Sequence, residues 1–144
     1  MAITIGDEYW AIIIELKNIL QNLTDDFGNV LFREVELGIA AKIDVVPSAY
    51  IIPEQSNIAV TTIEQEEYTF RFRILVVAES TTSEDAFNRA VDLAGYVINS
   101  LKDNHNLNGT CERFLITGFR PVAFARRGQL RSYVSIDCEA SIWR

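Results

Sequence analysis

Two segments of the chain repeat apolar residues with the period of an α-helix. The i, i+3, i+4, i+7 spacing predicts one amphipathic helix over residues 6–24 and a second within residues 80–104. Thr82 stands three residues before Asp85, a variant of the capping box that marks the start of the second helix. The apolar positions are Tyr9, Ile12, Ile13, Leu16, Ile19, Leu20 and Leu23 in the first helix, and Phe87, Ala90, Val91, Ala94, Val97, Ile98 and Leu101 in the second.

Strict alternation of apolar and polar residues predicts two long strands. The first begins at Tyr68, and its end is apolar on both faces. The second strand ends the chain. We expect it to pair with the extended stretch before Gly128 in a C-terminal β-hairpin, with Gly128 in the turn. Pro121 cannot donate to a ladder, so we expect that first arm to be an edge strand or to be bulged. One face of the first strand carries Tyr68, Phe70, Phe72, Ile74 and Val76, and the other Thr69, Arg71, Arg73, Leu75 and Val77; in the last strand Leu130, Val134, Ile136, Cys138, Ala140 and Ile142 oppose Arg131, Tyr133, Ser135, Asp137, Glu139, Ser141 and Trp143.

Two weaker patterns predict short strands between the helices. Residues 30–37 alternate imperfectly, and residues 48–53 form an apolar run between Pro47 and Pro53. Residues 38–47 show no pattern that assigns them to a strand or a loop. We therefore predict one α+β domain over residues 1–144: a mainly antiparallel sheet with the two amphipathic helices packed on one face and a C-terminal β-hairpin.

Composition is that of one soluble globular domain. Apolar residues make up 49% and charged residues 23% of 144 residues, a length that can bury one core. The first residues lack the basic start and cleavage site of a signal peptide, and Glu15 and Lys17 interrupt the apolar run that follows, so we expect no membrane span. Cys111 and Cys138 lack CxxC spacing, which indicates neither a disulfide framework nor a zinc site and favours a reducing cytoplasm.

Charge is distributed unevenly along the chain. Residues 113–144 hold six arginines and two acidic residues, a net of +4, whereas residues 1–112 hold 7 basic and 18 acidic residues, a net of -11. Such asymmetry points to an acidic partner, to nucleic acid or to another copy of the chain, and its alternative is a solvated strand face. The hairpin is expected to carry Arg120 on its first arm and Arg126, Arg127 and Arg131 at its tip or exposed face.

Catalytic and metal-binding patterns are scarce in the sequence. His105, the single histidine, stands in a polar turn, and no phosphate loop, G-x-S-x-G or H-E-x-x-H motif is present. Glu64, Glu66 and Glu67 are expected in an exposed loop. Trp10 and Trp143 are expected at the core edge or a subunit contact, with a ligand platform as the alternative, and Cys138 in the core. We expect no catalytic, cofactor-binding or metal-binding residues.

The order of these segments resembles the tail terminator, or tail completion, proteins of long-tailed bacteriophages. The resemblance rests on the N-terminal helix and on "VVPSAYIIPEQS", "YTFRFRILVVAES", "TSEDAFNRAVDLAGYVINSL" and "GQLRSYVSIDCEASIW", and covers nearly the whole chain; residues 35–46 depart from it. It implies a structural protein without catalytic residues, assembled in the host cytoplasm into the virion. Its copies would form a ring, usually a hexamer, that caps the tail tube protein and docks to the head connector, with DNA passing through the lumen.

Within such a ring, complementary charge on two different surfaces would fix the contact between neighbouring subunits. The candidate subunit or partner interface is Arg71, Arg73, Arg120, Arg126, Arg127, Arg131 and Trp143. Three alternatives remain open. They are a neck or head-completion protein of the same phage class, a small-molecule-binding or enzymatic α+β domain, and a nucleic-acid-binding module, which the pI of about 4.7 disfavours.

Overall fold

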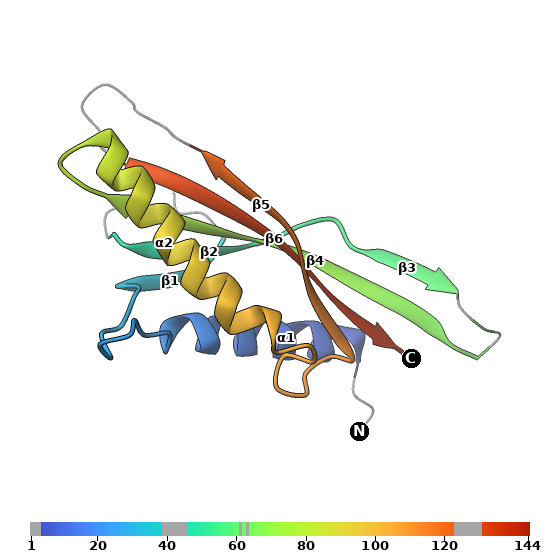
Figure 1. Cartoon of the computed structure of the whole chain (residues 1–144). Helices are drawn as coiled ribbons and strands as arrows, with labels where there is room; N and C mark the ends of the chain where they lie inside the picture. The colour runs from blue at the N-terminus through green and yellow to red at the C-terminus, as the bar shows by residue number, and fades with distance from the viewer. Residues whose placement is uncertain (1–3, 39–45, 61, 63, 123–130) are drawn as a thin grey trace.

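A computed structural model of the chain describes residues 4–38, 46–60, 62, 64–122 and 131–144 (Figure 1). The predicted α+β class is confirmed, with two helices and a six-stranded sheet that is mostly antiparallel. The elements follow in the order α1 (Ile5–Gln21), β1 (Glu34–Leu37), β2 (Ser48–Pro53), β3 (Asn57–Val60), β4 (Glu66–Glu79), α2 (Ser83–Lys102), β5 (Arg113–Val122) and β6 (Arg131–Trp143).

Helix α1 begins at a complete capping box. The Thr4 hydroxyl accepts from the Asp7 N–H at 3.1 Å, and the Asp7 carboxylate accepts from the Thr4 N–H, also at 3.1 Å. These two bonds satisfy backbone donors that a helix start leaves free. The helix ends at Gln21, three residues before the predicted boundary, because the chain turns at Asn22, whose side chain donates to the Asn18 carbonyl at 2.9 Å.

Helix α2 approaches the sheet through small side chains. Thr82 caps it as predicted, its hydroxyl accepting from the Asp85 N–H at 3.1 Å. Ala86, Ala90 and Ala94, spaced four residues apart, are all fully buried. Side chains of this size let the helix backbone lie close to the strands.

The sheet has the strand order β1-β2-β4-β6-β5, and β3 pairs with β4 beyond the end of β2. The β4–β6 ladder is antiparallel and runs from the pair Glu67↔Trp143 to the pair Glu79↔Arg131. The predicted C-terminal hairpin is confirmed as β5 and β6. Strand β5 is both an edge strand and bulged, between Ile116 and Gly118, as Pro121 had indicated.

The two faces of the sheet differ in character. One face carries Phe70, Phe72, Ile74 and Val76 of β4 into the main core. Tyr9 of α1 meets that face, with its ring centroid 5.0 Å from Phe70 and 5.5 Å from Phe72. Both helices pack on this face, and Figure 1 shows α2 lying across the strands. The opposite face, which we call the open face, has no described helix against it.

Three details differ from the sequence predictions. Strand β1 starts at Glu34 instead of at residue 30, and it pairs with β2 in parallel, so the sheet is mixed. Strand β3 was not predicted, because all four of its side chains are exposed and therefore show no alternation. Glu66 and Glu67 were expected in an exposed loop, but they are half-buried and form the first two residues of β4. The unassigned stretch 38–47 lies mostly outside the described residues.

Phe72 tests the importance of the central ladder, because its side chain is 1% exposed between the sheet and α1. Phe72→Ala is expected to lower the free energy of unfolding by about 3–5 kcal/mol through lost burial and a residual cavity. Urea denaturation followed by circular dichroism measures this change. Phe27→Ala is the control, since that side chain is 89% exposed and should change the value by less than about 0.5 kcal/mol.

Candidate functional site

Five of the seven predicted interface residues can be placed, and all five lie on the open face. Arg71 and Arg73 project from β4, Arg131 and Trp143 from β6, and Arg120 from β5 opposite Ser135. Arg126 and Arg127 lie outside the described residues. The structure thus brings together side chains that are up to 72 positions apart in the sequence, from Arg71 to Trp143.

The β4 arginines are already engaged within the chain. Arg71 stands directly opposite Glu139, with Nε 3.6 Å from Oε2. Arg73 stands opposite Asp137, at 3.3 Å, and also reaches Glu54 at 3.2 Å. Opposite charges at facing positions stabilise an antiparallel pair, although half-exposed ion pairs contribute little each. For these two residues the geometry favours the solvated strand face over a partner contact.

Further arginines of the basic C-terminal segment pair with the acidic part of the chain. Arg131 Nε lies 2.9 Å from a Glu79 carboxylate oxygen. Arg113 lies 3.5 Å from Glu67, and its guanidinium stands over the Trp143 ring, 5.7 Å from the centroid. Much of the charge asymmetry along the sequence is therefore compensated by pairing in the fold.

Arg144 and Arg120 differ in their partners. Arg144 ties the end of β6 to α1 and to the start of β5, because its guanidinium contacts both Glu8 and Glu112. These hydrogen bonds, to Glu8 first, raise the pKa of Arg144 above its usual value. Arg120 is exposed, and the described residues place no carboxylate within ion-pair distance of it. Among the described arginines of the predicted interface, Arg120 is the one whose charge is left for a partner.

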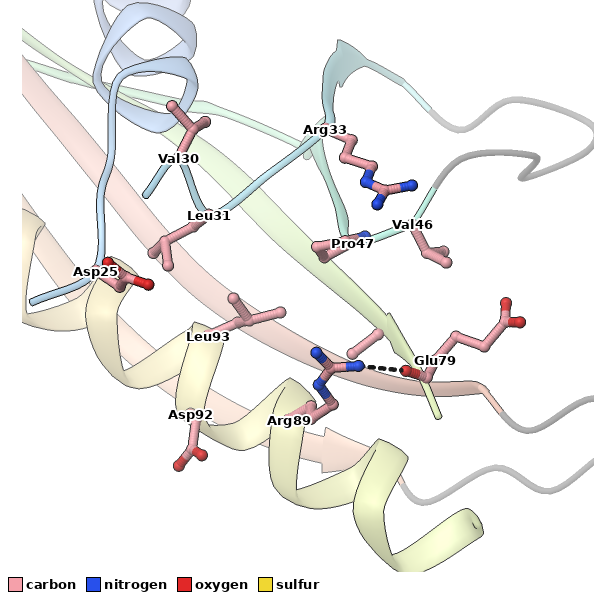
Figure 2. A pocket seen from close by; sticks show the side chains of 11 residues that line it. Asp25, Val30, Leu31, Arg33, Val46, Pro47, Glu79, Arg89, Asp92 and Leu93 are labelled. Atoms are coloured by element: carbon pink, nitrogen blue, oxygen red, sulfur yellow. Dashed lines mark hydrogen bonds between the residues drawn. The ribbon is translucent and has the colours of Figure 1, made fainter. Parts of the chain in front are cut away.

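A pocket of about 450 Å³ opens where α2 faces the starts of β1 and β2 (Figure 2). Its floor is apolar and includes Leu31, Pro47 and Leu93. Arg89 points into it from α2 and donates through Nη1 to the Glu79 carbonyl oxygen at 3.2 Å. Arg33 lines the side nearest β2. The sequence contained no signal for this pocket, because its walls come from four separate segments.

Asp25, one of the three acidic residues that line this pocket, has a structural task. The Asp25 carboxylate accepts from the N–H groups of Phe27 and Asn29, at 2.8 and 2.9 Å, and so holds the turn after α1. The Asn29 backbone bond is the main reason why the pKa of Asp25 is lowered. A carboxylate held ionised in this way is a poor proton acceptor near neutral pH. Glu79 and Asp92 line the pocket as well, so its described lining combines two guanidinium groups with three carboxylates around an apolar floor. The two guanidinium groups are the ones that could bind a small anion.

The other candidate residues of the sequence lie outside this pocket. His105 is exposed in the loop after α2, as predicted, and its carbonyl accepts from the Phe114 N–H. Among the residues that the structure describes, no group of three or more His, Cys, Asp and Glu side chains could hold a metal ion. Cys138 is buried in the core, as predicted, and Cys111 is buried as well. Trp10, expected at the core edge or at a subunit contact, is 54% exposed on the outer side of α1.

Apolar side chains are exposed on β3 and β5, two of the strands that border the sheet. Ile58 and Val60 of β3 are 66% and 75% exposed, and Leu115 and Phe119 of β5 are 41% and 45% exposed. In the described part of the chain, no strand pairs with the outer side of β3 or of β5. The sequence did not indicate either pair, because their exposure depends on which strands border the sheet.

A scan of the chain against protein-family models finds no match, and a search of curated proteins also finds none. Within the described residues, neither helix is long and apolar enough to cross a membrane.

The two thiols provide a test of burial. Burial raises the pKa of Cys111 to about 11 and that of Cys138 to about 12, so both stay protonated at neutral pH. We expect neither thiol to react rapidly with Ellman's reagent at pH 8 in the native protein, and both to react once it is unfolded in guanidinium. Rapid reaction of a native thiol, measured against free glutathione, would contradict this assignment.

The thiols lose their protons at a lower pH in the unfolded state than in the native state. The free energy of unfolding should therefore fall as the pH rises above about 9.

Proposed function

We propose that the chain is a structural protein of a long-tailed bacteriophage, a tail terminator whose copies form a ring on the tail tube and join it to the head connector. The observation that carries the proposal is the architecture. An N-terminal helix, the β2 strand, the long β4 strand, α2 and a terminal hairpin follow one another in the order on which the resemblance rests. They build one sheet with both helices on the same face.

The surface supports a role in assembly. Trp10 and Ile14 are exposed on the outer side of α1, one helical turn apart. Together with the apolar residues of β3 and β5, they place uncovered apolar area on three sides of one small domain. Apolar area of this kind, rimmed by polar residues, marks protein contacts. A ring protein needs several such surfaces, because it meets its neighbours, the tail tube and the connector.

The charge distribution is compatible with DNA passing through a ring without being held. Among the described arginines of β4, β5 and β6, all but Arg120 already have carboxylate partners. The chain as a whole carries a net charge of -7. Strong phosphate binding requires the release of many counterions by unpaired Lys and Arg, and DNA in transit needs the opposite.

A second candidate, a small-molecule-binding domain, is favoured by one observation, the pocket that Arg33 and Arg89 line. If it is correct, native mass spectrometry of the purified protein should show a retained small anion. Arg89→Ala should abolish the adduct, whereas Lys102→Ala, which removes an exposed charge far along the same helix, should leave it in place. An adduct-free spectrum that added phosphate or carboxylates do not change would eliminate this candidate.

For the leading proposal, the purified chain is expected to form closed rings with a central channel. Native mass spectrometry gives the number of copies, for which we expect six, and negative-stain electron microscopy shows the ring. Tail tubes of the phage that encodes the chain should become capped at one end, while tubes of an unrelated phage should not. A species that stays at the mass of one 16.3 kDa chain, both alone and with those tubes, would rule the proposal out.

A further inference from the structure

The two outer strands that carry exposed apolar residues are oppositely charged. Residues 54–67, which contain β3 and its turn into β4, hold four glutamates and no basic residue. Residues 113–122, which form β5, hold two arginines and no acidic residue. Each strand therefore combines a pair of uncovered apolar side chains with charge of one sign, and the signs are complementary.

Some of these charges remain unpaired within the chain. Glu54 and Glu67 are bound by Arg73 and Arg113. Glu64 is exposed and has no ion-pair partner among the described residues. Arg120 on β5 is likewise exposed and has no ion-pair partner among them. The fourth glutamate, Glu66, is half-buried and accepts from the Tyr68 hydroxyl at 2.7 Å. Glu64 and Arg120 are thus the exposed charges that remain for contacts outside the chain.

One chain cannot bring these two surfaces together. Strand β3 lies on the β2 side of β4, whereas β5 lies on the far side of β6, at the opposite edge of the sheet (Figure 1). Two different surfaces at opposite edges of one molecule match only between copies, in a head-to-tail contact. Such heterologous contacts close into rings when the rotation between neighbours allows it.

We propose that β3 of one copy packs against β5 of a second copy, with Ile58 and Val60 against Phe119, which the strand registers place on the same face of the sheet, and with Glu64 beside Arg120. The proposal rests on the ring function above and names the surfaces that build the ring. The contact is made mainly by side chains. The bulge at Gly118 and the missing N–H of Pro121 interrupt the outer edge of β5, and the Phe114 N–H is already bound to the His105 carbonyl, so a continuous backbone ladder cannot form there.

Charge reversal tests this contact. Glu64→Arg and Arg120→Glu should each weaken assembly of the chain by at least about tenfold, because each places like charges opposite each other at the contact. Sedimentation velocity over a range of concentrations measures assembly, and circular dichroism confirms that the variants fold. Glu84→Arg and Lys102→Glu change the net charge equally at exposed positions on α2 and should leave assembly unchanged.

Mixing the two variants gives the decisive result. Every contact between a Glu64→Arg subunit and an Arg120→Glu subunit pairs opposite charges, whereas contacts within either variant pair like charges. An equimolar mixture should therefore assemble although neither variant does alone. Recovery in the mixture requires the β3-to-β5 contact, and a mixture that stays dissociated overturns it.

The apolar part of the contact has its own variant. Ile58→Ser with Val60→Ser should abolish assembly, while Phe27→Ser, which removes a more exposed apolar side chain elsewhere, should not. If the wild type forms rings that all of these variants preserve, this contact is wrong and the ring function stands. If the wild type stays monomeric alone and with tail tubes, the ring function and this contact both fail. The wild type could also bind tail tubes without forming rings by itself. If these variants then abolish only the binding to tubes, the surface contacts the tube protein, and the proposed contact between copies is overturned.

Discussion

The antiparallel ladder between β4 and β6 is the constraint on which the rest of the structure depends. It pairs the two longest strands from Glu67↔Trp143 to Glu79↔Arg131, and side chains alternate between two faces along both strands. One register therefore sets two surfaces at once. A shift of β6 by one residue would move Ile136 out of the core and would separate Glu139 from Arg71.

The same register explains why a basic segment ends an acidic chain. Arg113 and Arg131 meet glutamates of β4, and Arg144 meets Glu8 at the start of α1. Each pair is exposed enough to contribute little to stability by itself. Together they give three of the six arginines of residues 113–144 a carboxylate partner within the chain.

The surfaces left over give the domain its proposed role in assembly. Two strands that border the sheet keep exposed apolar residues, Ile58 and Val60 on β3 and Leu115 and Phe119 on β5. Leu115 lies on the open face, and the other three lie on the face that carries the helices. Arg120 adds an unmatched charge on the β5 side. Because these surfaces lie at opposite edges of one sheet, they suit contact between successive copies better than a symmetric dimer.

Local periodicity was enough to predict both helices, β2, the long strand and the C-terminal hairpin, because repeats of 3.6 and 2.0 residues identify a buried side without knowledge of its partner. Pro121 likewise indicated a bulged edge strand, since a missing N–H acts wherever the residue is placed. The tertiary structure decided four other features. They are the parallel pairing of β1 with β2, the exposed strand β3, the pocket beside Arg89 and the carboxylates that face Arg71 and Arg73. Each of these depends on which distant segments become neighbours and in which register, and the spacing of residues within one segment carries no information about that.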